Sequence, residues 1–397
     1  MARAAAPAPT PLDVDALLAD PGTGIIVCCG SGGVGKTTTA AALGVRAAES
    51  GRRVVVLTID PARRLAQSLG LTELDNVPRP VEGVGRDGGS LDAMMLDMKR
   101  TFDEVVESHS TPEKAAQILA NPFYQAVSSS FAGTQEYMAM EKLGQLRAEA
   151  EREGTWDLVI VDTPPSRSAL DFLDAPKRLG SFLDGRFIRL LTAPARAGGR
   201  AYLKVFSVGA TVTAAALNKV LGGQLLSDVQ TFVAALDTMF GGFRERADVT
   251  YALLKEDATA FVVVAAPERD ALREAAYFVD RLGSEGMPLA GVVVNRMQRL
   301  AAPALSGSRA SAAAEQLEDA DDDAPAGAAG AAAMAGLTPA LLRLHADLAD
   351  VATRHQGHVA RFVAGHPGVP MATVPASATD IHDLDGLRRV GAALAAD

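Results

Sequence analysis

A glycine-rich stretch near the amino terminus, CCGSGGVGKTTTA at residues 28–40, limits what this chain can fold into. It fits the phosphate-loop pattern G-x-x-x-x-G-K-[ST], known as Walker A. The stretch follows a short apolar run at 25–29 and opens an alanine-rich segment with helical character. This order of strand, glycine loop and helix is the context that the pattern requires, and a second motif at 158–165 agrees with it. A chance glycine-rich turn is therefore a poor alternative, and the pattern predicts a nucleotide-binding P-loop protein.

The chemistry of this loop assigns a role to each residue type. Glycines allow backbone N–H groups to surround a β-phosphate, and the helix amino terminus adds partial positive charge. The Lys36 ammonium is expected to reach the β- and γ-oxygens and to take part in catalysis, and the Thr37 hydroxyl is expected to bind Mg²⁺. The predicted nucleotide contacts of the loop are Gly30, Ser31, Gly32, Gly33, Val34, Gly35, Lys36, Thr37 and Thr38.

Two aspartates follow other predicted strands. LVIVDTPP at 158–165 places Asp162 at the end of a buried strand, where a Walker B carboxylate holds the metal. TIDPARRLAQSLG places Asp60 after the strand at 54–59, beside the phosphate loop in this type of sheet. A carboxylate there orients or deprotonates the water that attacks the γ-phosphate. An Asp-Pro turn that caps the next helix is the alternative for Asp60; the other two motifs favour catalysis.

The rest of the chain alternates short β-branched runs with longer helical ones. This alternation predicts an α/β fold with a mostly parallel sheet flanked by helices on both faces. Most of the strand runs are apolar throughout, as strands buried on both faces are. About seven strands are expected, at 25–29, 54–59, 93–97, 158–162, 261–266, 291–295 and 371–374.

Two segments break the alternation. Residues 176–255 are expected to form an inserted helical subdomain, because apolar residues recur there at helical spacing. Residues 301–336, rich in Ala, Gly and Asp, are expected to be a disordered loop, after which Thr338 and Pro339 begin a helix. The domain prediction is a tail at 1–21, the ATPase core at 22–175 and 256–300, the helical insertion, the disordered loop, and a carboxyl-terminal segment at 337–397 with the last helix and strand.

Composition excludes several classes of protein. The formal net charge is −10, which argues against DNA as a partner. No run approaches 18 uncharged apolar residues, so no stable membrane insertion is expected. The amino terminus has no apolar signal region, and the two cysteines, Cys28 and Cys29, indicate small buried side chains in a reducing compartment. A soluble, cytoplasmic protein is expected.

Taken together, these motifs resemble the ATPases related to the arsenite-pump ATPase and the tail-anchored-protein-targeting ATPase, which belong to the deviant Walker A class. The resemblance covers about residues 22–300 and 367–395. It implies a dimer that binds and hydrolyses Mg-ATP, with Asp60 as the catalytic aspartate. It also implies adenine contacts by Asn295 and Pro375. The segments that carry it are GSGGVGKTT, IDPARRLAQSLG, AGTQEYMAMEKL at 132–143, DTPPSRSALDFL at 162–173, FVVVAAPERDALREAAYFVDRL at 261–282, Asn295-Arg296 and Val374-Pro375.

The sequence departs from the family pattern at Ser31. In family form this position is a lysine that reaches the nucleotide of the partner subunit. Three explanations stay open: a lysine-bearing paralogue completes the site in a heterodimer, another cation such as Arg167 substitutes, or the chain hydrolyses ATP slowly and acts as a nucleotide-gated binder.

Other departures bear on the substrate. The chain lacks clustered thiols and a zinc-binding CxxC, and Ser168 replaces a family histidine, so arsenite transport is not expected. The run after Asn295 lacks the aspartate of guanine-specific proteins, which favours ATP over GTP. A metal site at His355 and His358 is not expected, because no third ligand is evident. The helical insertion either packs its own core or, as the resemblance implies, binds a hydrophobic client. A surface-patterning ATPase of the partitioning type is a weaker alternative.

Overall fold

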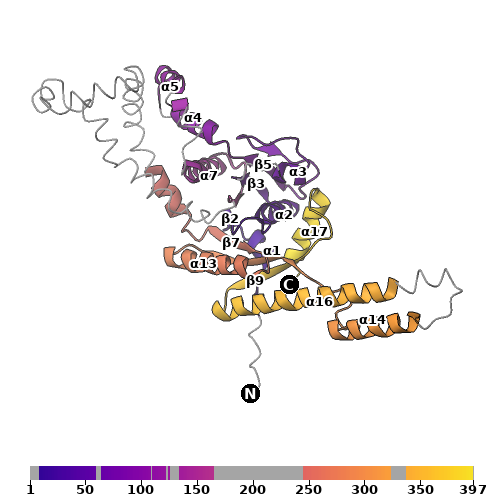
Figure 1. Cartoon of the computed structure of the whole chain (residues 1–397). Coiled ribbons are helices and arrows are strands. Elements are labelled where there is room, and N and C mark those ends of the chain that lie inside the picture. The colour runs from indigo at the N-terminus through magenta and orange to yellow at the C-terminus, as the bar shows by residue number, and fades with distance from the viewer. Residues whose placement is uncertain are drawn as a thin grey trace, which may run out of the picture.

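The protein, in a computed structural model, is built on one nine-stranded sheet (Figure 1). The structure describes residues 9–59, 64–108, 110–121, 124–125, 134–164, 245–322 and 337–396. The strand order is β1-β9-β8-β7-β2-β6-β3-β5-β4, and all neighbours are parallel except β4 and β5. The strands are β1 (Thr10–Pro11), β2 (Ile25–Cys29), β3 (Arg53–Thr58), β4 (Arg79–Pro80), β5 (Ser90–Met95), β6 (Leu158–Asp162), β7 (Thr259–Ala265), β8 (Leu289–Met297) and β9 (Pro370–Pro375).

The seven predicted strands are all present, and the α/β prediction is confirmed. The count was low by two, because β1 and β4 add two residues at each outer edge. Inner strands are buried along their full length: β2, β6 and β7 have no exposed residue. Burial on both faces explains why these strands are continuous apolar runs and do not alternate.

Helices cover both faces of the sheet. Alternate side chains of β2 show the two layers, since Cys29 belongs to one apolar core and Cys28 to the other. The first core contains side chains of α4 (Met98–Ser108), α5 (Pro112–Leu119), α7 (Thr134–Glu153), α13 (Arg269–Glu285) and α16 (Leu337–Gly365). The second contains side chains of α1 (Val14–Ala19), α2 (Lys36–Glu49), α3 (Arg64–Ser68) and α17 (Leu384–Leu394).

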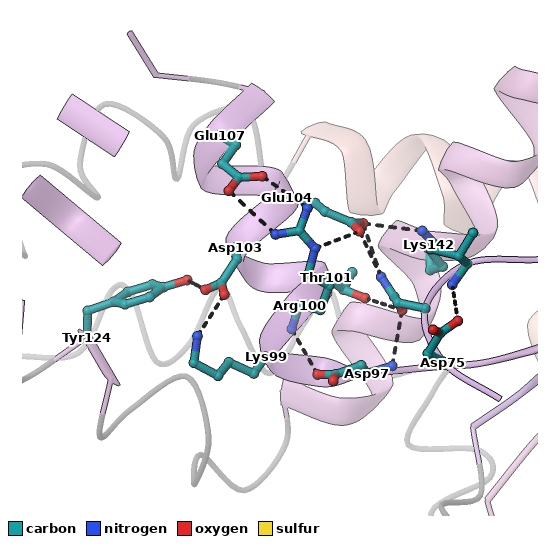
Figure 2. A network of polar contacts seen from close by, with 12 residues as sticks. Asp75, Asp97, Lys99, Arg100, Thr101, Asp103, Glu104, Glu107, Tyr124 and Lys142 are labelled. Atoms are coloured by element: carbon teal, nitrogen blue, oxygen red, sulfur yellow. Dashed lines mark hydrogen bonds and ion pairs between the residues drawn. The ribbon is translucent and has the colours of Figure 1, made fainter. Parts of the chain in front are cut away.

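A polar network fixes α4 at the edge of the first layer (Figure 2). Asn76, which is buried, donates through Nδ2 to both carboxylate oxygens of Glu104 at 3.1 Å. The Lys142 ammonium of α7 donates to Glu104 at 3.2 Å. The Asn76 side-chain oxygen accepts hydrogen bonds from the Asp97 amide and the buried Thr101 hydroxyl. Glu104 thus joins α4 to α7 and to the chain that precedes β4.

The prediction of disorder at 301–336 is wrong for part of that segment. Residues Gly307–Asp322 form helix α14, which packs along α16 as a hairpin (Figure 1). Ala310 and Ala314 are fully buried in the seam, and a Cβ on Gly307 would lie 3.2 Å from Ala349 Cβ. Alanine favours helix and lets two helices approach closely, so few large side chains are needed. The remainder, 323–336, lies outside the described residues.

Helix α16 begins at Leu337, within two residues of the predicted start at Thr338 and Pro339. The predicted helical insertion at 176–255 lies outside the described residues except for its last part, where 245–253 is helical. Within the ranges given above, no helix has the length and apolar character needed to cross a bilayer.

Candidate functional site: a phosphate loop at the carboxyl edge of the sheet

The glycine loop joins β2, the central strand of the sheet, to helix α2. Two of its glycines have positive φ and no room for a side chain. A Cβ on Gly30, with φ 149°, would lie 2.1 Å from the Val264 carbonyl oxygen of β7. A Cβ on Gly35, with φ 97°, would lie 2.1 Å from Asn295 Nδ2 of β8. The backbone of the loop is therefore held against two other strands, which only glycine permits at these positions.

The loop ends as the N-cap of α2. Gly35 occupies this position and has no side chain to bond the first helical amides. Those N–H groups and the positive end of the helix dipole face the loop, an arrangement that binds anions. With the cradle that the glycines form, this arrangement fits a phosphate group.

Lys36 is the first residue of α2 and is only 5% exposed. Its ammonium donates a hydrogen bond of 2.9 Å to the Ser31 carbonyl oxygen, so the side chain crosses the loop. An ammonium held over the glycines by a neutral acceptor can interact with phosphate oxygens that enter the loop.

Thr37 and Asp162 lie together, as the two motifs predicted. The Thr37 hydroxyl donates to Asp162 Oδ2 at 2.7 Å, and the Thr58 hydroxyl donates to the same oxygen at 2.9 Å. Asp162 is fully buried and pairs in register with Cys28 of β2 and Thr58 of β3. A carboxylate and a hydroxyl beside an anion cradle are hard oxygen ligands, the donor type that Mg²⁺ prefers. The residues present fit a magnesium ion held by Thr37 and Asp162.

The two cysteines lie directly below the loop. Cys28 and Cys29 are 0% and 2% exposed and point to opposite faces of the sheet. Burial raises the pKa of the Cys29 thiol to about 12. Burial, with the nearby Asp162 carboxylate, raises the Cys28 pKa well above its ordinary value. Both thiols are therefore protonated at neutral pH and unreactive, in agreement with their prediction as small buried side chains.

Asn295 contacts the phosphate loop itself. Its Nδ2 donates to the Val34 carbonyl oxygen at 2.9 Å, and its Oδ1 accepts from the Arg296 amide at 2.9 Å. Pro375 lies on the neighbouring strand, in register with Met297. The two predicted adenine contacts thus stand on adjacent strand ends at the edge where the loop lies. Sequence reasoning did not foresee the contact between Asn295 and the loop.

A pocket of about 300 Å³ adjoins the loop. Ser31 to Val34 line one side, and the other side consists of Ala266, Glu268, Asp270, Ala271, Glu274 and Arg296. Sequence analysis did not single out Glu268, and it named Arg296 only as part of the Asn295-Arg296 segment. Arg296 lies near the end of β8, and Glu268 follows Ala265, the last residue of β7, by three positions. A position at the carboxyl end of an apolar strand is also the signal that identified Asp162. Arg296 also has φ 61°, uncommon for a residue with a side chain.

Other predicted site residues are not placed. Asp60, Arg167 and Ser168 lie outside the described residues. Ser31 is half-buried, at the side of the loop that lines the pocket. Thr38 follows Thr37 in the first turn of α2 and is half-buried. His355, considered as a metal ligand, accepts a hydrogen bond through Nδ1 from the Gln298 amide at 3.2 Å.

Comparison with known proteins agrees with this site. Residues 23–304 match the family model of the ArsA-type anion-transporting ATPases. The chain is 30% identical over 154 residues to ATPase GET3 of Malassezia globosa, covering 39% of this chain and 43% of that protein. It is 29% identical over 157 residues to the arsenical pump-driving ATPase of Acidiphilium multivorum, covering 39% and 26%. ATPase GET3C of Arabidopsis thaliana is 23% identical over 278 residues, covering 68% and 65%.

These alignments span less than half of the first two relatives, whereas the family model covers most of this chain. The matched region contains the glycine loop, Thr37, Asp162 and Asn295, the residues that the structure gathers at one edge of the sheet. The chain belongs to the anion-transporting ATPase family, as a P-loop, nucleotide-binding member.

Proposed function

We propose that the protein binds and hydrolyses Mg-ATP as a dimer and couples its nucleotide state to the predicted helical subdomain at 176–255, which binds a partner or hydrophobic client. One observation carries the catalytic part of this proposal. Thr37 and Asp162 share a hydrogen bond directly beneath a glycine cradle that Lys36 crosses. This set provides an anion site, a cation and hard oxygen ligands at one place.

The geometry supports a separate role for each of these residues in ATP hydrolysis. The loop amides and Lys36 bind the β- and γ-phosphates, and Lys36 exchanges its bond to the Ser31 carbonyl for phosphate oxygens. Thr37 and Asp162 would hold Mg²⁺, which neutralises charge that develops on the phosphate oxygens. Asn295 keeps the loop in place through Val34. Asp60 orients the attacking water and accepts its proton as the water oxygen bonds to the γ-phosphorus, the bond from that phosphorus to the β–γ bridging oxygen breaks, and ADP leaves.

The role of Asp60 gives the first prediction. Asp60→Asn keeps the shape of the side chain and removes the proton acceptor, so ATP binding should be normal and turnover lost. General-base assistance contributes about 10²–10⁴ in rate. Affinity for a labelled ATP analogue and steady-state phosphate release measure the two properties separately. Turnover retained in the variant would remove Asp60 from this role.

Ser31 keeps a second function open: a nucleotide-gated binding subunit with little turnover of its own, which works with a lysine-bearing paralogue. Serine supplies no cation at a loop position that lines the pocket. A cation inserted from a partner at an analogous position is worth about 10³–10⁵ in rate in other P-loop enzymes. The choice between enzyme and binding subunit therefore depends on this position.

Steady-state ATP hydrolysis by the wild type and by Ser31→Lys tests the proposal. A large gain from lysine is expected, because Lys36, Thr37 and Asp162 already lie together at the glycine loop. High turnover in the wild type with no gain would assign the cation to another group, such as Arg167. If both chains bind Mg-ATP and neither turns over, the binding subunit is the better description; Ser31→Ala is the matched control for loss of the hydroxyl.

A further inference from the structure

The α14–α16 hairpin presents an apolar stripe that the sheet does not cover. Among the described residues, seven large hydrophobic side chains are strongly exposed, and four of them lie on this hairpin. Leu337, Leu341 and Leu344 of α16 are 51%, 55% and 53% exposed, and Leu317 of α14 is 42% exposed. The α16 leucines are spaced four and three residues apart, so they share one face, with the spacing of a coiled-coil seam.

The same face of α16 is buried farther along the helix. Continuing the four-three spacing from Leu344 leads through His355 to Phe362, which is 6% exposed and packs in the core with α13. At that end His366 also pairs with Asp280 of α13. Helix α14 packs on the opposite face, where Ala346 and Ala349 are buried. The leucine stripe therefore lies on the same face of α16 that is buried at Phe362, but on the part of the helix that extends beyond the sheet domain.

The leucine stripe lies beyond the carboxyl edge of the sheet, on the part of α16 that extends past the ends of the strands. His355 contacts the amide of Gln298, directly after β8 ends at Met297. The chain runs from α16 into β9, which is parallel to β8, so α16 is antiparallel to both strands. Leu337 precedes His355 by 18 residues, which places it about 27 Å farther along the helix axis. Figure 1 shows this end of the hairpin extending away from the sheet.

These observations bear on what covers the stripe. The phosphate loop and its pocket lie at the same carboxyl edge of the sheet. A protein that docks on that edge would therefore contact the leucines. An anionic membrane is disfavoured, because α14 has Glu315, Glu318, Asp319, Asp321 and Asp322 against one arginine. The proposed function closes two copies over ATP at this edge, so a second copy is the protein that would meet the leucines.

We propose that the leucine stripe of α16 packs against a second copy of this chain, as an arm of a symmetric dimer. The proposal rests on the proposed dimeric function. In a two-fold dimer each copy donates its hairpin and receives the other, so the contact is made twice. Both stripes are then buried, and loss of the leucines weakens the dimer without any change in the nucleotide site.

The test is dimer formation by the double variant Leu341→Glu/Leu344→Glu, measured by sedimentation with Mg²⁺ and a non-hydrolysable ATP analogue, and without them. The dissociation constant should rise by at least about tenfold, because two charges would replace apolar contacts on each copy. Val77→Glu is the matched control: Val77 is 61% exposed and precedes β4 at the far edge of the sheet. The dimer dissociation constant of Val77→Glu should match that of the wild type. Leu341→Ala/Leu344→Ala should also raise the dimer dissociation constant, but by a smaller factor.

Two further measurements separate this inference from the proposed function. Thermal unfolding shows whether the leucine variants remain folded, and a labelled ATP analogue reports the nucleotide site of each chain. A dimer that is indifferent to the leucines would overturn the inference alone and would assign the stripe to a client or a membrane. A wild type that binds ATP but stays monomeric would overturn the inference together with the dimeric part of the proposed function. A wild type that binds no ATP would overturn the proposed function instead, and the nucleotide-free dimer would still test the stripe.

Discussion

At the scale of single residues, Asn295 connects strand β8 to the phosphate loop. It belongs to β8, yet its side chain closes the phosphate loop through the Val34 carbonyl and lies against Gly35. The family resemblance assigns this asparagine to adenine. The contact seen here assigns it in addition to the shape of the loop, since a carbonyl held in place keeps the neighbouring amides aimed at phosphate.

A ligand that lacks the adenine base can separate these two roles of Asn295. Asn295→Ala should weaken binding of inorganic triphosphate as well as ATP, by about fivefold, because one net hydrogen bond of about 1 kcal/mol is lost from the loop. Titration calorimetry of both ligands gives the comparison, with Pro375→Ala as the control for an adenine contact. Normal triphosphate affinity together with weak ATP affinity would leave Asn295 with the adenine role alone.

At the scale of elements, the position of α4 depends on one carboxylate. Glu104 accepts hydrogen bonds from Asn76 and Lys142, and the side chain of Lys142 is 11% exposed (Figure 2). The helix follows β5 at the carboxyl edge of the sheet, with Asp97 as the residue whose side chain bonds the Arg100 amide in the first turn. A change at Glu104 therefore affects an element that borders the site edge without touching the phosphate loop.

Glu104→Ala should lower the free energy of unfolding by about 1–3 kcal/mol, because it leaves the buried Asn76 amide and the Lys142 ammonium without this acceptor. Glu104→Gln keeps an oxygen for Asn76 and should lose less. Denaturant unfolding of both variants measures the effect, and affinity for an ATP analogue should stay close to that of the wild type. Equal stability of Glu104→Ala and the wild type would show that solvent replaces the carboxylate.

At the scale of the whole molecule, the nucleotide loop is framed by strands from distant parts of the chain. β2 lies between β6 and β7, and Val264 and Asn295 close the loop from β7 and β8. Residues of the amino-terminal third alone therefore do not make the site. Binding at the loop should stabilise the sheet as a unit, since one ligand contacts elements that belong to both apolar cores.

Mg-ATP analogue at about 100 times its dissociation constant should stabilise the native state by about 2.7 kcal/mol, or raise Tm by roughly 3–5 °C for a chain of this length. Differential scanning fluorimetry measures the shift, and removal of Mg²⁺ by chelation should reduce it. Lys36→Ala is the control, because it removes the cation that crosses the loop. A full shift in that variant would place the ligand elsewhere on the protein.

The sequence was sufficient for the features that depend on local pattern. Most of the seven inner strands are continuous apolar runs, whereas β1 and β4 have two residues each and include prolines, so pairing with β9 and β5 defines them. The glycine motif and Asp162 were predicted, and the structure brings Thr37 and Asp162 together. The Asn295 contact with Val34 was not predicted, because it depends on which strand lies beside the loop. Helix α14 was missed because its alanines gave no apolar periodicity.

The strand order also has a consequence for synthesis of the chain. Asn295 and Val34 are 261 residues apart, and β2 obtains its second neighbour only when β7 has been made. At translation rates of about 5–20 residues per second, the ribosome needs on the order of 13–50 seconds between these positions. Until β7 has been made, β2 has a bare apolar edge, which is prone to pairing with other chains. The nucleotide loop is therefore completed late in synthesis, after both β7 and β8 have been made.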